Sequence, residues 1–345
     1  MINLYGLTLK KLEELMLNEG QNKFRAKQLF TWIYEKQVND FDQMSDISKN
    51  FREVLKSKYV LEKPKIFIKQ EASDGTIKLL LEMSDGSKVE TVLMKYNYGN
   101  VACVSSQVGC NKGCSFCASG LLKKQRNLEA HEMVGEILVL NDLLKEQNER
   151  VTHVVVMGTG EPFDNYDNVI DFIRIINDQK ALAIGARHIT VSTCGLPDKI
   201  IQYGQEGLQI NLAISLHAPN NELRSKLMKI NKAYPLEVLI PAVKKYIELA
   251  NRRVTYEYIM LKDVNDSLEH AKELVELIKP TYAYVNLIPY NQVDENGFKR
   301  ADNSRVRDFM DYLMKHGVTT TIRKEFGTDI DAACGQLRAK QLKRG

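Results

Sequence analysis

The sequence predicts an α/β protein whose main domain is a partial (β/α)6 barrel. After residue 100, short apolar segments alternate with amphipathic segments of helical period, which is typical of strands joined by crossover helices in a parallel sheet. Polar or glycine-rich clusters follow the ends of most of these apolar segments, and no internal repeat or low-complexity linker interrupts the region. At 345 residues the chain has room for about two domains, so we expect smaller segments before the barrel.

Residues 1–60 are predicted to form a small helical accessory domain. Apolar residues from Leu7 to Met16 recur at helical spacing, and Gly20 follows as a stop signal. A second amphipathic stretch covers residues 24–34, and Ser48 stands where it can cap a third helix. The sequence therefore indicates three short helices ahead of the first strand.

Residues 61–99 are predicted to form an antiparallel β meander between the helical domain and the barrel. Two Ser-Asp-Gly turns, at 73–75 and 84–86, separate apolar stretches, and turns of this kind are a strong hairpin signal. The meander strands are expected at 66–68, 77–81 and 89–94.

Residues 100–326 are predicted to form the barrel, and 327–345 a C-terminal loop with a basic tail. The expected strands are 101–107, 153–157, 188–193, 210–216, 253–260, 284–288 and 319–323. The expected helices are 129–146, 166–178, 220–230, 235–250, 267–279 and 303–316. This alternation also suits a doubly wound sheet, but barrel active sites are built from the loops that follow the strands. The barrel is favoured because polar clusters stand at those positions, in 109–117, 158–162, 192–195, 215–218 and 289–291.

Composition places the chain among ordinary globular proteins. It is 44% hydrophobic and 27% charged, which excludes a disordered chain, and no stretch approaches the roughly 18 consecutive apolar residues of a membrane span. Because Lys10, Lys11 and Glu13 interrupt the N-terminal segment, it lacks the apolar run of a signal peptide. We expect a cytoplasmic protein with no membrane partner. The net charge of +4 permits nucleic-acid binding without requiring it.

The cysteines carry the clearest chemical signal. There are six, too few and too clustered for a secreted protein held by disulfides. Four of the six fall within fifteen residues, which in a reducing compartment indicates metal or redox chemistry. Cys194 lies apart from them and has the character of a core thiol at a strand end.

Cys110, Cys114 and Cys117 form a C-x3-C-x2-C motif in a loop that contains two glycines. Three thiolates so close in sequence suit an iron–sulfur cluster with one open iron, or a zinc ion. A structural zinc ion would need a fourth protein ligand, and no second cysteine pair follows. The candidates for that ligand are Cys103, His131 and His153. The spacing favours iron–sulfur over zinc.

The cysteine motif resembles the signature of the radical S-adenosylmethionine (SAM) superfamily. Phe116 occupies the aromatic position before the last cysteine, and residues 158–162 (Gly-Thr-Gly-Glu-Pro) are similar to the superfamily's GGEP motif. The resemblance implies a partial barrel that holds a 4Fe–4S cluster on the three cysteines, with SAM chelating the open iron. Reduction of such a cluster cleaves SAM to a 5′-deoxyadenosyl radical.

Further motifs resemble the RlmN/Cfr family of RNA methyltransferases over essentially the whole chain. They are Cys-Val-Ser-Ser-Gln-Val-Gly-Cys at 103–110, Ser-Thr at 192–193, Ser-Leu-His-Ala-Pro at 215–219, Asn-Leu-Ile-Pro-Tyr-Asn at 286–291 and Asp-Ile-Asp-Ala-Ala-Cys-Gly at 329–335. Pro162 after Glu161 favours the RlmN branch. The resemblance implies methylation of carbon 2 of an adenosine in the peptidyl-transferase region of 23S rRNA, and of the adenosine 3′ of the anticodon in some tRNAs.

The resemblance also implies a route and the residues that serve it. Adenine carbon 2 is electron-poor and does not attack the methyl group of SAM, so a radical route is required. Cys334 would take a methyl group from one SAM, and a second SAM would yield the radical that activates this methyl for addition to the ring. Glu90 would accept the ring proton. Cys103 would release the product by forming a transient disulfide with Cys334.

The same resemblance implies SAM contacts and partners. The SAM-binding residues would be Gly160, Glu161, Ser192, Ser215, Leu216, His217 and Asn291. We expect a monomer that acts on 23S rRNA and tRNA, touches RNA through its helical domain, and receives electrons from a donor such as flavodoxin or ferredoxin. Basic residues suited to phosphates follow the cysteine loop and crowd the C-terminus, at Lys123, Lys124, Arg126, Arg338, Lys340, Lys343 and Arg344.

Three alternatives are compatible with the sequence. A Cfr-type enzyme would methylate carbon 8 of the same rRNA adenosine. A non-catalytic, zinc-containing RNA-binding protein would use the cysteines without cleaving SAM. A radical SAM activase would act on another protein instead of RNA.

Overall fold

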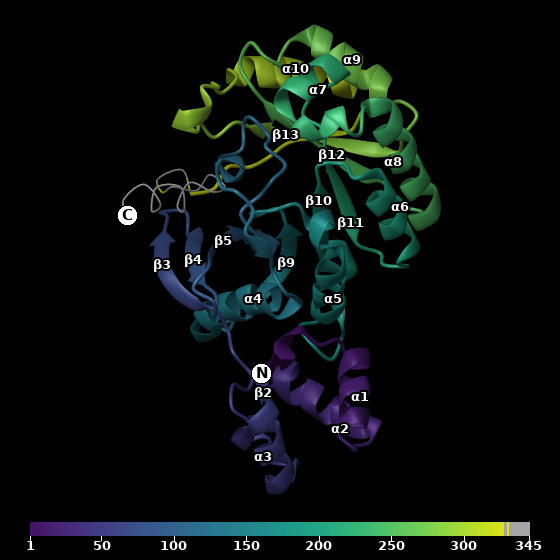
Figure 1. Cartoon of the computed structure of the whole chain (residues 1–345). Helices are drawn as coiled ribbons and strands as arrows, with labels where there is room; N and C mark the ends of the chain where they lie inside the picture. The colour runs from purple at the N-terminus through teal and green to yellow at the C-terminus, as the bar shows by residue number, and fades with distance from the viewer. Residues whose placement is uncertain (328–329, 331–345) are drawn as a thin grey trace.

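The parallel sheet predicted after residue 100 is present in the computed structural model, which describes residues 1–327 and 330. Its strands lie side by side in chain order, each parallel to the next (Figure 1). They are β6 (Gly99–Val104), β9 (Val151–Val156), β10 (Ile189–Thr193), β11 (Asn211–Ser215), β12 (Val254–Met260), β13 (Ala283–Pro289) and β14 (Thr320–Ile322). A doubly wound sheet reverses its strand order at a switch point. The unbroken order here is that of a barrel, as predicted.

Helices connect successive strands and cover the outer face of the sheet (Figure 1). They are α4 (Ala130–Leu144), α5 (Tyr166–Asn177), α6 (Pro197–Gln205), α7 (Asn221–Leu227), α8 (Leu236–Ala250), α9 (Leu268–Ile278) and α10 (Asn303–Lys315). Helix α6 was not predicted from the sequence. It begins with Pro197, whose fixed φ and missing N–H suit the first turn of a helix.

The meander is continuous with the barrel sheet. It consists of β3 (Lys65–Glu71), β4 (Ile77–Glu82) and β5 (Lys88–Tyr96), each antiparallel to the next. Strand β5 then pairs with β6, so that the described residues place ten strands in one sheet. The meander is therefore a wall of the partial barrel as well as a connection to it.

The segment after β14 crosses from the last strand back to the meander. The Phe326 ring packs on that of Tyr96 with their centroids 4.4 Å apart. The backbone N–H of Gly327 donates to Asp74, in the turn between β3 and β4, at 2.9 Å. Residues 323–327 thus span the open side of the partial barrel at the point where the C-terminal segment begins.

The N-terminal domain contains α1 (Leu9–Asn18), α2 (Lys23–Phe30) and α3 (Lys49–Lys58), in agreement with the predicted helical segments. Two short strands, β1 (Ile2–Asn3) and β2 (Tyr59–Val60), pair and bring the ends of the domain together. Ser48 precedes α3, but its side chain makes no capping hydrogen bond. Short 3₁₀ turns lie at Leu4–Gly6, Phe41–Gln43, Ala118–Leu121, Lys145–Gln147, Pro162–Asn165, Ala186–His188, Lys229–Lys232 and Asp294–Asn296, with a π turn at Thr31–Glu35.

Gly6 marks the contact between the two domains. A Cβ atom on Gly6 would lie 2.8 Å from the backbone nitrogen of His131, at the start of α4, so a side chain there would push the domains apart. Figure 1 shows the helical domain below α4 and α5, away from the other end of the barrel. In the described part of the chain, no helix is long and apolar enough to span a bilayer.

Side chains of the parallel strands alternate between the two faces of the sheet. Val154 and Val156 face outward into the core beneath the helices, whereas Val155 faces the barrel interior beside Cys103. Polar residues share the inner face, and Ser192, Ser215 and Glu257 all line a cavity there. Because polar side chains share the inner face with apolar ones, the barrel interior can hold a ligand.

Candidate active site

The cysteine loop is closed at its base by backbone pairing. It follows β7 (Gln107–Val108), which pairs antiparallel with β8 (Arg126–Asn127). Within that stem, the N–H of Cys110 donates to the carbonyl of Leu122 at 3.0 Å. The loop therefore has a fixed base, and the cysteines lie on its curved part.

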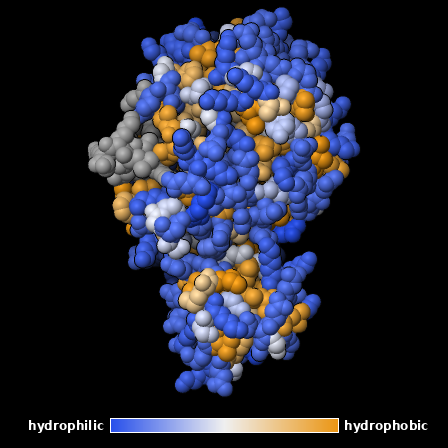
Figure 2. Space-filling view, in the orientation of Figure 1, coloured by the Kyte–Doolittle hydropathy of each residue, from blue (hydrophilic) through white to orange (hydrophobic). Residues whose placement is uncertain are grey.

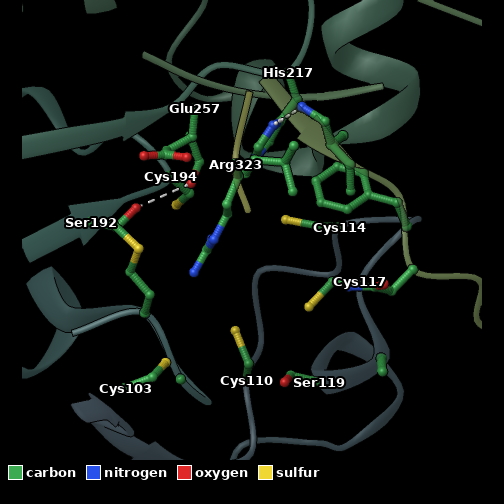
Figure 3. Close-up of a pocket in the computed structure, with 18 of the residues that line it drawn as sticks. Cys103, Cys110, Cys114, Cys117, Ser119, Ser192, Cys194, His217, Glu257 and Arg323 are labelled. Atoms are coloured by element: carbon green, nitrogen blue, oxygen red, sulfur yellow. Dashed lines mark hydrogen bonds between the residues drawn. The ribbon is translucent and has the colours of Figure 1, made fainter. Parts of the chain in front are cut away.

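Gly109 lets the loop leave β7 at a sharp angle. Its φ is +77°, and a Cβ atom there would lie 2.2 Å from the carbonyl oxygen of Lys123, so no other residue fits without moving the backbone. Figure 3 shows the sulfur atoms of Cys110, Cys114 and Cys117 facing one common space. The loop thus brings the three predicted ligands together.

A cavity of about 320 Å³ lies at the carboxyl ends of the parallel strands, where the sequence places the active site. Most of the predicted site residues that the structure describes line it. They are Cys103, Cys110, Cys114, Cys117, Gly160, Glu161, Ser192, Ser215, His217 and Asn291. Glu90 and Leu216 are not among the described residues that line it.

The three thiols suit a positively charged centre. Burial raises the pKa of Cys114 well above its ordinary value, and the neighbouring Cys117 and Cys110 raise it further. Burial likewise raises the pKa of Cys110. Three thiolates in one buried space repel each other unless cations lie between them. Iron is a metal that thiolates bind well, and iron ions between the sulfur atoms would remove that repulsion. The donor set therefore fits an iron–sulfur cluster.

Glu161 is fixed with its carboxylate at the cavity wall. One oxygen accepts hydrogen bonds from the N–H of Phe163, at 3.0 Å, and from the Thr193 hydroxyl, at 2.7 Å. The other accepts from the N–H of Cys194 at 2.8 Å. Burial raises the pKa of Glu161, and these donors oppose that shift because they stabilise the ionised form. A held carboxylate of this kind can bind an ammonium group.

The glycines of the Gly158–Pro162 segment allow two strand-end loops to lie in contact. A Cβ atom on Gly158 would lie 2.7 Å from the Ser105 hydroxyl, and one on Gly160 would lie 2.7 Å from Cβ of Gln107. The Gln107 side chain accepts from the N–H of Glu161 at 2.9 Å. The motif's glycines therefore act through packing, and their small size sets the position of Glu161.

His217 is a neutral hydrogen-bonding group. Its Nδ1 accepts from the N–H of Ile259 at 3.1 Å, which leaves the proton on Nε2. Burial lowers the pKa of His217 to about 3, and the Arg224 guanidinium acts in the same direction. The ring also meets Phe116 edge to face, with centroids 4.8 Å apart. His217 can therefore donate one hydrogen bond to a ligand at any pH near neutrality.

Arg224 is a fully buried side chain that the sequence did not reveal. Its Nη2 donates to the carbonyls of Cys194, at 2.7 Å, and Ser215, at 3.2 Å. Its Nε donates to Leu216 at 3.2 Å, and its Nη1 to Asn231 at 2.9 Å. Arg224 therefore links the carboxyl ends of β10 and β11 through hydrogen bonds to their backbone carbonyls. Because these acceptors are uncharged, burial lowers the pKa of Arg224 to about 10.

Leu216, Cys103 and Cys194 occupy three different kinds of position. Leu216 has its side chain in the hydrophobic core, and its backbone N–H donates to the carbonyl of Glu257. Cys103 lies on β6 opposite Val92 and lines the cavity below the cluster cysteines (Figure 3). Cys194 is buried, as expected of a core thiol, but it also reaches the cavity wall.

Some predictions fall outside the described residues. Cys334, the predicted methyl carrier, lies there, as do the basic residues of the tail, Arg338, Lys340, Lys343 and Arg344. Of the other predicted phosphate contacts, Arg126 is occupied by protein groups. Its guanidinium pairs with Asp85 at 2.6 Å and Glu132 at 2.7 Å, so its charge is compensated within the fold.

Arg323 is a further cavity residue that the sequence did not single out. Figure 3 shows its side chain reaching into the space between Ser192 and the cluster cysteines. It follows β14, so the rule that placed the other strand-end residues could also have found it. The charge of Arg323 acts against the burial that raises the pKa of Glu257. The cavity lining thus contains a carboxyl group, that of Glu257, and a guanidinium group, that of Arg323.

The histidines considered for zinc lie elsewhere. His131 pairs with Glu129, Nδ1 to Oε2, at 3.1 Å. The His153 ring stacks on His188 with centroids 4.0 Å apart. In the described residues, no three His, Cys, Asp or Glu side chains gather closely enough to hold a single metal ion.

Comparison with known proteins gives matches to both parts of the chain. Residues 2–61 match the ribosomal RNA large subunit methyltransferase N-terminal domain, and residues 104–278 match the radical SAM superfamily. An Enterococcus faecalis protein named probable dual-specificity RNA methyltransferase RlmN is 55% identical over 99% of this chain and 97% of its own. A Spiroplasma citri protein of the same name is 53% identical over 99% of this chain and 98% of its own. A radical SAM methyltransferase structure from Sphaerobacter thermophilus covers 98% of this chain and 100% of its own, with 41% identity and a TM-score of 0.92.

Proposed function

Because the chain belongs to the RlmN family of radical SAM RNA methyltransferases, we propose that it methylates carbon 2 of adenosine in two RNAs. The sites are an adenosine in the peptidyl-transferase region of 23S rRNA and the adenosine 3′ of the anticodon in some tRNAs. The observation that carries the proposal is full-length identity of more than half with proteins named dual-specificity methyltransferases. Pro162 after Glu161 supports carbon 2 over carbon 8.

Family membership confirms several predictions outright. The fold is the radical SAM fold, the activity is SAM-dependent RNA methylation, and the cofactors are a 4Fe–4S cluster and SAM. The non-catalytic zinc-binding alternative is therefore wrong. We further propose that the enzyme is a cytoplasmic monomer and takes electrons from a flavodoxin or ferredoxin.

The described residues support a division of roles around the cofactors. Cys110, Cys114 and Cys117 would hold the cluster, and Glu161 would bind the ammonium group of SAM. When bound, the cluster and SAM supply the one-electron chemistry that removes hydrogen from the transferred methyl group. The neutral ring of His217 would donate a hydrogen bond to SAM from Nε2. Gly160, Ser192, Ser215 and Asn291 would complete the SAM site from the cavity wall.

Two thiols and a carboxylate would then serve transfer and release. Cys334 would carry the methyl group as a thioether and hold the RNA covalently after carbon–carbon bond formation. Glu90 would accept the proton that leaves ring carbon 2. Cys103, which lines the cavity, would attack the sulfur of Cys334 and break its bond to carbon. The carbon would keep the electron pair and take up a proton to become the methyl group, and a disulfide would be left for the cell to reduce.

The helical domain offers a surface for the RNA. Helix α2 exposes Lys23 and Lys27 one turn apart, with Phe24 63% exposed between them. Figure 2 shows apolar patches among hydrophilic residues on this domain. Cations that neutralise phosphates and a ring that can stack on a base suit a nucleic-acid partner.

Nucleoside analysis tests the proposed function. Cluster-loaded enzyme is incubated anaerobically with SAM, a reductant, and protein-free 23S rRNA or tRNA, and the digested nucleosides are analysed by mass spectrometry. We expect 2-methyladenosine from both RNAs. Accumulation of 8-methyladenosine instead would establish the Cfr-type alternative. Methylated Cys334 without any RNA product would favour the activase.

A Cys103→Ala variant tests the release step. It should stall with RNA covalently held on Cys334, which a denaturing gel of labelled RNA detects. Normal turnover without a covalent product would show that Cys103 is not the resolving thiol.

A further inference from the structure

Lys78 is a lysine buried completely inside an apolar strand. It lies on β4, where its neighbours are Ile77 and Leu79, and its exposure is 0%. Its Nζ lies 3.5 Å from Oε1 of Glu90, which is 5% exposed on β5. A lysine is almost never fully buried unless it is paired, so the contact with Glu90 accounts for its place in the wall.

The strand register puts both side chains on the inner face of the sheet. Lys78 is opposite Val92, and Leu80 is opposite Glu90, so Lys78 and Glu90 are diagonal neighbours on one face. Val92 and Met94 share that face and line the cavity. The ion pair therefore lies on the same face of the meander as residues that line the cavity.

The pair is a poor choice for stability alone. Removing two charges from water is costly, and well-packed apolar residues of similar size are often as stable or more so. Leu80, which is opposite Glu90 on the same face and is buried, shows that an apolar side chain is accommodated here. The burial of an ammonium group at this position instead points to a need for a charged carboxylate beside the cavity.

We propose that Lys78 is a positioning residue that holds the Glu90 carboxylate in place for the release step. This inference rests on the proposed function. Glu90 is 5% exposed, and the Lys78 ammonium 3.5 Å away supplies the opposite charge that a buried carboxylate requires. The contact therefore fixes the position of the Glu90 carboxylate before the RNA arrives.

The step itself is a simple proton transfer. The bond between ring carbon 2 and its hydrogen breaks, the electron pair stays on the ring, and the proton moves to a carboxylate oxygen of Glu90. Lys78 exchanges no proton with the RNA. Its effect is therefore confined to the step that Glu90 performs, and earlier steps should not depend on it.

The test is a Lys78→Met substitution in the full-length, cluster-loaded enzyme with SAM, a reductant and labelled 23S rRNA fragment. Methionine keeps the approximate length without the charge. We expect the first turnover to yield 5′-deoxyadenosine as in the wild type and RNA to accumulate covalently on the protein. Release of 2-methyladenosine should fall at least about 100-fold, the typical contribution of a general base.

Matched variants separate a role in release from a role in folding. Lys69→Met, which removes an exposed lysine on neighbouring β3, should release product as the wild type does. Glu90→Gln should accumulate the same covalent RNA. The double variant Lys78→Met/Glu90→Gln leaves neither charge of the pair in the wall, so it should fold even if the single variant does not. It should lose no more release activity than Glu90→Gln alone.

Two results would overturn the inference. The first is normal release of 2-methyladenosine by Lys78→Met. The second is loss of 5′-deoxyadenosine together with release in the folded single or double variant, because that would make the pair structural. A wild-type enzyme that forms no 2-methyladenosine in the same assay would instead contradict the proposed function.

Discussion

The two walls of the cavity place their polar residues in different ways. In the β/α wall, formed by the carboxyl ends of the parallel strands and the loops after them, most polar side chains lie at a strand end, as Ser192 and Ser215 do, or just after it, as Glu161 and His217 do. Glu257, within β12, is an exception. In the meander wall, formed by β4 and β5, the charged residues Lys78 and Glu90 lie within the strands themselves. The β/α wall has most of its polar side chains at the strand ends, whereas the meander wall has a buried ion pair among apolar side chains.

This difference decides what each wall can do. Loops at the rim can approach a ligand closely, and contacts such as that between Gly160 and Gln107 fix them to each other. A charge inside a strand cannot move far, so its position in the wall is fixed. We therefore propose that the β/α wall binds the cofactors and that the meander wall serves proton transfer during release.

Among substitutions in the β/α wall, loss of a cluster ligand should reduce activity most. We expect Cys110→Ala to reduce RNA methylation below detection and to lower iron content and visible absorbance, because two thiolates cannot hold the cluster in place of three. Cys194→Ala is the matched control, since Cys194 lines the same cavity without belonging to the motif. Equal iron loss in both variants would show that the motif does not define the ligands.

Removal of the buried cation beneath that wall should have the next largest effect. Arg224→Met would leave several backbone carbonyls at the ends of β10 and β11 without their donor. We expect unfolding free energy to fall by about 3 kcal/mol or more, with weaker SAM binding. Chemical denaturation and SAM titration measure the two effects. Unchanged SAM affinity would mean that Arg224 supports only the fold.

Disturbing the contact between the strand-end loops should lower the free energy of unfolding by a smaller amount. Gly160→Ala adds a Cβ atom 2.7 Å from that of Gln107 at a φ of +117°, and should cost about 1–3 kcal/mol of stability. Gly207→Ala is the control, because φ is also positive there but a Cβ atom would meet nothing within 4 Å. A smaller loss for Gly160→Ala than for Gly207→Ala would refute the importance of the close contact.

The effect that is smallest near neutral pH concerns acid stability. Because burial lowers the pKa of His217 to about 3, the unfolded chain binds a proton below about pH 6.5 that the folded chain does not. Stability should therefore fall as pH drops from about 6.5 toward 3, by up to about 1.4 kcal/mol per pH unit from this group. His217→Asn, whose amide oxygen can replace Nδ1, should flatten the curve of unfolding free energy against pH. An unchanged slope would contradict the neutral state of His217.

The contrast between the walls also explains what the sequence could predict. The parallel strands, the cysteine loop and residues such as Ser192 follow local patterns and a rule about strand ends, and the structure brings them together. Helix α6 was missed because its short segment has few apolar residues, although Pro197 is a start signal. Most residues at the strand ends of the barrel can therefore be predicted from the sequence.

Residues that act through burial were harder to predict. Arg224 follows Asn220 in a short polar helix, and nothing in that stretch indicates that its guanidinium is enclosed. Lys78 could have been noticed as one charge among five residues of an apolar strand, but charged residues in antiparallel strands usually face water. Leu216 was assigned from a motif, which does not tell side chain from backbone.

A step-resolved single-turnover experiment tests the division between the walls most directly. Wild type, Cys110→Ala, Glu90→Gln and Lys78→Met are compared for 5′-deoxyadenosine, covalent protein–RNA product and free 2-methyladenosine. We predict that Cys110→Ala forms none of the three, whereas the two meander variants form 5′-deoxyadenosine and covalent RNA but release little product. Loss of 5′-deoxyadenosine in the meander variants, or normal release by them, would contradict the assignment of release to that wall.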